Sequence, residues 1–330
     1  MTAFDLGGVR RLIVGNQPTT SIQIASDRVT GVTVGNGLSN KVTAIVTEPL
    51  PSGVVIPTAN AANIVDRDAV GVVLSRVLRD LPRSPTRVAL VLPDSAAKVS
   101  LMSFEELPTR ASDLEDLVRW QARKTAPFPI EDAQIGYSTG LVTGEGRREL
   151  VVSFIRRDIV EEYEGVCENA GVHPGVVDLA SFNLVNAAFM VGSTEKADWL
   201  LVHVANDYST IIIVRDGRLV LFRNRSYGGN EGFPDLLHQT VMYYEDRLDG
   251  VGFKRAFLAT SALSIGREQV ADLRRLIELR LEIGVEAISL GDSRSCLSGV
   301  EESLTDLAVA PLGLLLRDRW ALAGTRATDS

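Results

Sequence analysis

The sequence is poor in the residues that most often hold metals or form covalent cross-links. Its 330 residues include only two cysteines, Cys167 and Cys296, and three histidines. Two cysteines cannot build the disulfide framework of a small secreted domain, so both are expected to be buried thiols in a reducing compartment. The histidines, His173, His203 and His238, lack the spacing of metal ligands, and no metal site is predicted.

Long apolar runs and basic clusters are also missing. The longest uncharged stretch, Pro49–Val65, spans 17 residues with three prolines, short of the roughly 20 apolar residues that a membrane helix needs. Met1–Arg11 carries charge early and has no long apolar core, unlike a secretory signal. The net charge of −8, without a long Lys/Arg run, argues against nucleic-acid binding. We therefore expect a soluble, cytoplasmic protein without a membrane span.

The sequence instead contains two similar successions of strands and helices. In the first, strand patterns cover Ser21–Thr47, a helix pattern covers about Asp66–Leu81 and a buried strand covers Arg87–Leu92. The second begins with a strand at Trp199 and continues with a hairpin across Asp216-Gly217. The two units predict an α/β protein with two sheet-centred lobes and a cleft between them.

A segment of different character, residues 94–175, lies between the two units. Its predicted order is strand, helix, strand, strand, and the helix begins at the capping box Ser112-x-x-Glu115. Two strands joined by a polar loop follow, and then a helix over about Arg157–Ala170. This pattern predicts a small inserted subdomain.

Four further motifs follow one another along the chain. The most specific is Asp113–Tyr137, an acidic helix with a central Trp, then a Pro-Phe-Pro turn and a strand that ends in Tyr. The others lie at 170–188, at 216–229 and at Pro311–Arg317. In this order they resemble the PilM family, the cytoplasmic actin-like component of type IV pilus assembly, over about residues 20–317.

The resemblance implies an actin-like, ribonuclease-H-like fold of two lobes with an inserted FtsA-like α+β subdomain. Residues 1–93 and 176–198 would form the first lobe, 94–175 the inserted subdomain and 199–330 the second lobe. The resemblance also implies a non-catalytic scaffold that binds the cytoplasmic N-terminal tail of the bitopic membrane protein PilN. The protein would then lie at the inner membrane through this partner, and the pilus motor ATPase is a further candidate partner.

The family's nucleotide-binding turns are degenerate in this chain. At such turns a phosphate must come close to backbone N–H groups, which a glycine without a Cβ allows. A carboxylate must also bind Mg²⁺ or the waters that coordinate it. The usual Asp-Ile-Gly reads Gln23-Ile24-Ala25, the usual Asp-x-Gly reads His203-Val204-Ala205, and a Gly-Gly reads Thr260-Ser261. The affected positions, with two surviving glycines, are Gln23, Ala25, Ser26, His203, Ala205, Asn206, Gly228, Gly229, Thr260 and Ser261.

Asp27 and Asp207 lie near the lost acids but are shifted along their turns. The pair Gly228-Gly229 equally suits a turn into the next helix. We therefore predict a pseudo-ATPase scaffold that needs neither ATP nor Mg²⁺ as a cofactor and has no catalytic residue. An ATP-driven switch of the pilus machine and a GspL-like component of type II secretion are the alternatives, and the lack of a C-terminal membrane helix argues against the second.

The helix of the inserted subdomain carries the candidate partner-binding residues. Trp120 lies one turn from Leu117 and is predicted to belong to the core of the subdomain, with contact to a partner peptide as the alternative. Arg119 and Arg123 are predicted to be exposed on the same helix and share that alternative.

Overall fold

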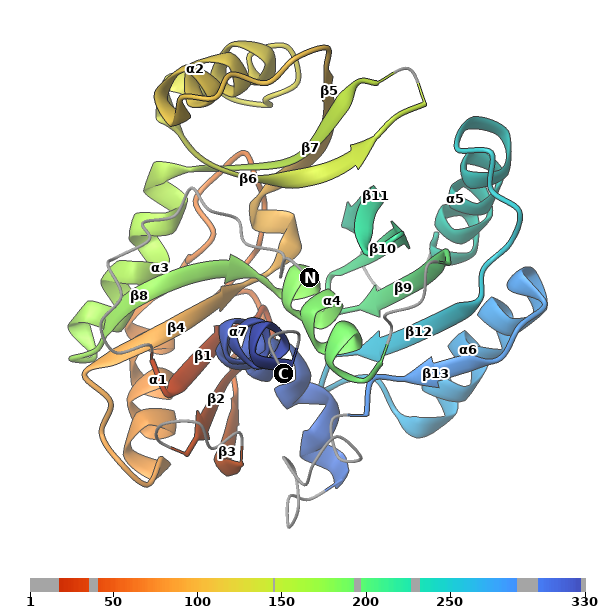
Figure 1. Cartoon of the computed structure of the whole chain (residues 1–330). Helices are drawn as coiled ribbons and strands as arrows, with labels where there is room; N and C mark the ends of the chain where they lie inside the picture. Colours follow the sequence, from red (N-terminus) through yellow and green to blue (C-terminus); the bar gives the residue numbers. More distant parts are fainter. Residues whose placement is uncertain are drawn as a thin grey trace.

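The computed structural model describes residues 18–35, 41–144, 146–192, 197–226, 232–289 and 302–327, with side chains described for 305–317 of the last range. Two five-stranded sheets and one three-stranded sheet form its framework (Figure 1). The two lobes are thus centred on sheets, as predicted. Among the helices of the described residues, none is both long and apolar enough to cross a bilayer.

The first lobe is built on a sheet in the order β3-β2-β1-β4-β8. Antiparallel pairing joins β1, β2 and β3, whereas β4 and β8 run parallel to β1. The strands are β1 (Thr20–Ile24), β2 (Arg28–Val34), β3 (Val42–Pro49), β4 (Arg87–Leu92) and β8 (His173–Leu179). Residues of β1 and β2 are buried throughout, because helices cover both faces of this sheet.

The second lobe repeats this arrangement with the order β11-β10-β9-β12-β13. Here β9, β10 and β11 are antiparallel, and β12 and β13 run parallel to β9. The strands are β9 (Trp199–Val204), β10 (Tyr208–Arg215), β11 (Arg218–Ser226), β12 (Arg255–Thr260) and β13 (Val285–Ala287). The internal repeat predicted from the sequence is therefore present in the pairing of the strands.

Helices cover the outer face of each lobe (Figure 1). On the first lobe these are α1 (Arg67–Asp80) and α3 (Arg157–Asn169), and on the second α5 (Phe233–Arg247) and α6 (Arg267–Leu281). The side chain of Asp66 caps α1 by accepting a hydrogen bond from the backbone N–H of Ala69 at 2.9 Å. The apolar stripe of α1 is buried against the sheet, as its sequence pattern predicts.

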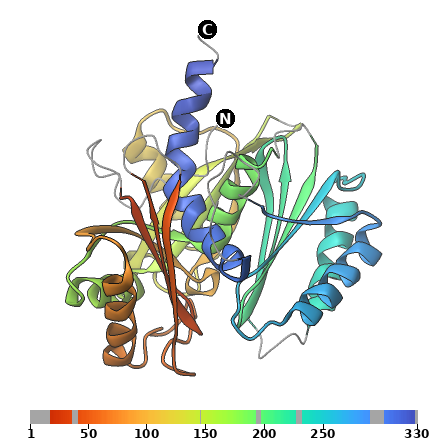
Figure 2. The same ribbon diagram turned by 90° about the horizontal axis from the view of Figure 1, so that it is seen from below.

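Two helices lie between the lobes in both views, α4 (Ala180–Met190) and α7 (Glu302–Ala327) (Figures 1 and 2). They pack closely, because a Cβ added to Gly313 of α7 would lie 2.0 Å from the backbone oxygen of Asn183. The predicted boundaries placed α7 in the second lobe, but it packs mainly against α4 and the first sheet. The order of the elements along the chain therefore led to the wrong lobe for this helix.

The inserted subdomain is a sheet in the order β5-β7-β6 with α2 on one face. Its elements are β5 (Lys98–Phe104), α2 (Ala111–Ala122), β6 (Ala133–Val142) and β7 (Arg148–Arg156), with the short 3-10 turns η1 (Asp94–Ala96) before it and η2 (Ile130–Asp132) within it. The strand β5 is the strand predicted, without bounds, before the helix of this subdomain. The predicted capping box does not form, because Ser112 lies inside the first turn of α2 and donates to Asp113.

The helix α3 also differs from the predicted boundaries. We predicted it within the inserted subdomain, but it packs against α1 and β8 of the first lobe. The Glu162 carboxylate on α3 accepts hydrogen bonds from the backbone N–H groups of Asn63 and Ile64, at 2.7 and 3.1 Å. Cys167 of the same helix is a buried free thiol, as predicted, and burial raises its pKa to about 12. Cys296 lies outside the described residues.

Candidate functional site: the crevice between the lobes

The turns predicted to replace the nucleotide-binding turns face each other across the lobes. One joins β1 to β2, the other joins β9 to β10, and the same backbone bond closes both. The N–H of Ala25 donates to the oxygen of Arg28, and the N–H of Ala205 donates to the oxygen of Tyr208, each at 2.9 Å. The fold repeat therefore extends to the geometry of these turns.

The two turns are joined directly. The Ser26 hydroxyl donates to Oδ1 of Asp207 at 2.7 Å, and the Asn206 amide donates to Oγ of Ser26 at 3.4 Å. Burial raises the pKa of the Asp207 carboxyl, and the Ser26 hydrogen bond partly offsets this effect. Side chains of the protein itself thus span the gap between the two lobes at these turns.

A buried arginine ties the third turn to the first lobe. Arg28 is fully buried, and its Nη1 donates to Oδ1 of Asp27 at 2.8 Å and to the backbone oxygen of Ser261. The other carboxylate oxygen of Asp27 accepts from the N–H of Leu263 at 2.7 Å. Desolvation lowers the pKa of Arg28, and the neighbouring Asp27 carboxylate opposes this shift.

A buried polar cluster lies beside these turns and contains Asp94, Ser181, His203, Thr210 and Ser261. Asp94 accepts hydrogen bonds from the Ser181 N–H at 2.9 Å, the Thr210 hydroxyl at 2.7 Å and the Ser181 hydroxyl. His203 Nδ1 lies 2.8 Å from Oγ of Ser181, and its Nε2 lies 2.6 Å from Oγ of Ser261. The cluster links η1, α4, β9, β10 and the turn after β12.

The order Ser261, His203, Asp94 resembles that of a hydrolytic triad, with Oδ2 of Asp94 3.4 Å from Nδ1 of His203. Its surroundings do not fit that role. Ser261 is 6% exposed and His203 and Asp94 are fully buried, so no substrate carbonyl reaches the hydroxyl. The cluster satisfies buried polar atoms and holds the lobes together, which is the usual role of such networks.

The residues of the crevice do not fit Mg-ATP. A Mg²⁺ ion requires carboxylate oxygens or waters, but Asp27 is paired with Arg28 and Asp207 accepts the Ser26 hydroxyl. The imidazole of His203 is fully buried at the position where the resemblance leads one to expect the second acid. The phosphates would also have to lie between two turns that are already hydrogen-bonded to each other.

The structure brings together eight of the ten degenerate positions, and their geometry is that of neighbouring turns at the ends of β1, β9 and β12. Gly228 and Gly229 lie outside the described residues. The sequence analysis missed Arg28, Asp94, Ser181 and Thr210. The acidic residue directly after Leu92-Pro93, at the end of a buried strand, is the signal that could have indicated Asp94.

The candidate partner-binding residues lie on α2, away from the crevice. The prediction that Trp120 belongs to the core is wrong, because 56% of the side chain is exposed and the ammonium of Lys124 lies 4.7 Å from the centre of its ring. Arg119 donates to the backbone oxygen of Ile130 at 3.1 Å, and Arg123 donates to Glu131 at 2.9 Å. Both arginines therefore tie α2 to η2.

Comparison with known proteins agrees with this architecture. Residues 22–247 match the family described as "Type IV pilus assembly protein PilM". The solved "PilM-PilN type IV pilus biogenesis complex" is similar with a TM-score of 0.75 and 16% identity, over 91% of this chain and 98% of that one. A Bacteroides thetaiotaomicron protein with an actin-like ATPase fold and unknown function has a TM-score of 0.50 and 12% identity, over 81% of this chain and 89% of that one.

No curated protein is detectably similar in sequence. The solved structures establish the actin-like fold, with a repeated sheet in two lobes and an inserted subdomain. The family match covers more than half of the chain. The chain belongs to the PilM family of type IV pilus assembly proteins.

Proposed function

We propose that this protein is a cytoplasmic scaffold of the inner-membrane platform of the type IV pilus, and that it works without hydrolysing ATP. The observation that carries the proposal is the direct contact between the Ser26 and Asp207 turns. In an actin-like ATPase, the two turns must leave room for phosphates and a metal ion between them. A crevice closed by side chains suits a binding protein rather than a nucleotide-driven one.

The proposed partner is a PilN-like membrane protein, which reaches the scaffold with its cytoplasmic N-terminal tail. The fold similarity to the solved PilM-PilN complex supports this partner. The proposed contact is the junction of the first lobe with the inserted subdomain, where Arg156 at the end of β7 donates to the backbone oxygen of Asn60 at 2.5 Å. Ile56 on the same loop is 54% exposed and offers an apolar contact to a tail that orders on binding.

Calorimetric titration of a synthetic PilN tail into the full chain tests the partner. Binding should be measurable, and Ile56→Asp should weaken it by about ten-fold or more because it places a charge at the apolar contact. Leu279→Asp on α6 is the matched control, since Leu279 is also exposed, at 82%, and lies on the other lobe. Absence of heat at high micromolar tail, or equal weakening by both variants, would contradict the proposed binding.

A thermal melt with and without millimolar Mg-ATP tests the second part of the proposal. A ligand at 100 times its dissociation constant stabilises a folded protein by about 2.7 kcal/mol. For a protein of this size, that would raise the melting temperature by several degrees. We expect an unchanged melting temperature, and a clear rise would replace the scaffold with a nucleotide switch.

A further inference from the structure

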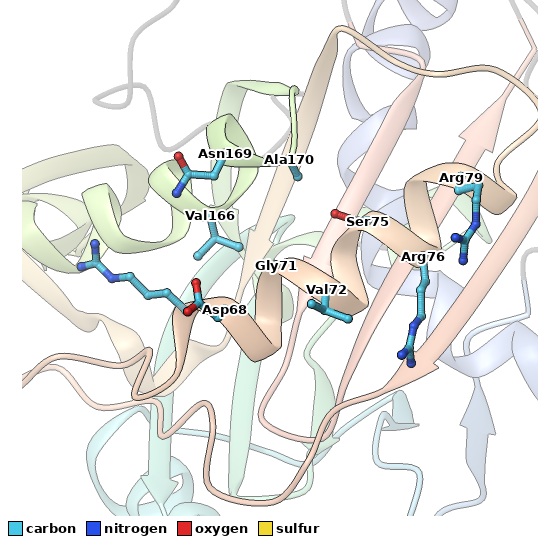
Figure 3. A pocket seen from close by; sticks show the side chains of 10 residues that line it. Asp68, Gly71, Val72, Ser75, Arg76, Arg79, Val166, Asn169 and Ala170 are labelled. Atoms are coloured by element: carbon cyan, nitrogen blue, oxygen red, sulfur yellow. The ribbon is translucent and has the colours of Figure 1, made fainter.

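A groove of about 550 Å³ lies between α1 and α3 on the outer face of the first lobe (Figure 3). It is separate from the crevice between the lobes, because all of its lining residues come from α1 and from α3 with its C-cap. The α1 side carries Arg67, Arg76 and Arg79, and the α3 side carries Val166 and Asn169. None of these residues takes part in the proposed contact with a PilN-like tail.

The charge of the groove is opposite to that of the protein. Three arginines and one carboxylate, Asp68, line it, whereas the whole chain has a net charge of −8. Within the described residues, Arg67 and Arg76 make no ion pair. Arg79 lies 3.6 Å from Asp80 in an exposed pair, which solvent screens strongly.

The presence of an arginine at position 67 is not explained by a preference of the helix for this residue. This residue lies in the first turn of α1, where the helix dipole disfavours a cation, whereas Arg76 and Arg79 lie near the C-terminal end. Three guanidinium groups along one helix provide forked donors that match carboxylates. The groove therefore has the donors that an acidic ligand requires.

The groove also contains apolar surface and open space. Val72 of α1 is 53% exposed, whereas Val166 of α3 is buried beneath the groove. Gly71 lies beside Val72 in the interior of α1, and a Cβ added there would meet no atom within 4 Å. Glycine weakens a helix interior relative to alanine, and the packing of this chain does not require it at this position.

We propose that the groove between α1 and α3 binds an acidic peptide segment of a partner protein. Carboxylates of the segment would pair with Arg67, Arg76 and Arg79, and an apolar side chain would contact Val72. The concave shape and the apolar contact favour a peptide over an anionic membrane surface, which would need a flat or convex basic face.

Fluorescence anisotropy with three labelled peptides and the full chain tests the proposal. The first peptide combines Glu and Asp with two leucines, the second replaces its acids with lysine, and the third replaces its leucines with serine. We expect saturable binding of the first alone, with a dissociation constant in the micromolar range. Raising the salt concentration should weaken this binding.

Two variants and one control assign the binding to the groove. Arg76→Glu should weaken it by about ten-fold or more, whereas Arg247→Glu at the end of α5 should leave it unchanged. Both variants change the net charge equally. Gly71→Leu should fill the open space and remove binding without lowering the melting temperature, because a Cβ at residue 71 would have no atom within 4 Å outside the adjoining turns of its own helix, and Leu has a higher helix propensity than Gly.

Three results would overturn the proposal. The first is equal weakening by Arg76→Glu and Arg247→Glu, which would reduce the effect to net charge. The second is the absence of saturable binding at millimolar peptide. The third is capture of the protein by phosphatidylglycerol vesicles through Arg76 without peptide binding. Each result is independent of the titration with the PilN tail, since the peptides and variants differ.

Discussion

The contact between the two turns buries Asp207 and changes the pKa of its carboxyl group. Burial raises the pKa of this carboxyl above its ordinary value of 3.8, although Ser26 donates a hydrogen bond to it. The ionised form is therefore disfavoured in the folded state relative to the unfolded state. The folded protein holds the proton more tightly, so the stabilisation is present at low pH and is lost as the pH rises through the raised pKa.

Replacing Asp207 with Asn should therefore raise the melting temperature at pH 7, because Asn keeps the acceptor for Ser26 without a charge to desolvate. The difference from the wild type should shrink as the pH falls towards 3.8, the ordinary value for Asp. Melts of both proteins between pH 4 and pH 8, at about constant ionic strength, measure this difference. Asp246→Asn on α5 is the control, because it removes the same charge from an exposed side chain of the second lobe.

A wild-type protein that melts higher than Asp207→Asn at pH 7, with a gap that closes on acidification, would contradict the prediction. In that case the negative charge of the Asp207 carboxylate, and not only its hydrogen-bond acceptor, would hold the turns together.

For single residues, the sequence predicted which turn a residue belongs to better than it predicted which side chains the residue contacts. Gln23 and His203 could be placed because each lies near the end of the first strand of its repeat. Asp94 and Ser181 could not, because their contact with His203 joins a 3-10 turn and a helix that are far apart in sequence. Trp120 was misplaced because α2 buries Val118 and Ala122, and a residue between them on a helix points away from that side.

Among the elements, α7 depends most on a single small residue. Gly313 lies where α7 crosses α4, and a Cβ there would overlap the backbone oxygen of Asn183. Backbone atoms cannot move aside as the end of a flexible side chain can. The Pro311–Arg317 motif therefore includes a glycine for close approach of two helices, and the alanine side chain is already too large.

Gly313→Ala should destabilise the protein by about 1–3 kcal/mol, because the two helices must separate. Gly71→Ala in α1 is the matched control, with the same chemical change in another helix interior and open space around the added methyl. It should stabilise the protein by about 0.5–1 kcal/mol. Urea denaturation of both variants measures the two effects. Stabilisation by both variants would show that helix propensity outweighs the close contact between α7 and α4.

The order of elements along the chain was a reliable guide to the sheets but not to the packing of helices. Hairpins and parallel strands follow directly from alternation, turns and buried runs, so the strands of the second sheet and all strands of the first except β8 could be predicted. The partners of α7 could not, because it packs against α4, β1 and β2, which are far away in the sequence. The helix α3 contacts α1 and also β8, which follows it directly along the chain, so its place in the first lobe depends on a strand that was not predicted. The bounds of β5 could not be predicted, because only part of this strand is buried, which weakens its apolar pattern.

For the whole molecule, the main core crosses the boundary between the lobes. One continuous apolar cluster includes Ile22 of the first sheet, Phe257 of the second and Leu312 of α7. Phe182 of α4 also contacts Phe222 of β11, with ring centres 5.4 Å apart. Neither lobe can unfold without exposing apolar surface of the other, so the lobes should unfold together.

Scanning calorimetry should show a single transition in which both lobes unfold. Leu312→Ala, in the shared part of the core, should lower stability by about 2–5 kcal/mol and keep one transition. Ile277→Ala, in the separate cluster of the second lobe, should lower the same transition. Two resolved transitions in the wild type, or a split produced by Ile277→Ala, would show that the lobes unfold independently.

The Ser26–Asp207 bridge sets the distance between the lobes from within the polypeptide. The outer surfaces therefore keep one relative orientation before any partner arrives. A partner that binds across such a preorganised body uses none of its interaction free energy for domain closure, and its apparent dissociation constant is not raised by a population of molecules in an open, non-binding state.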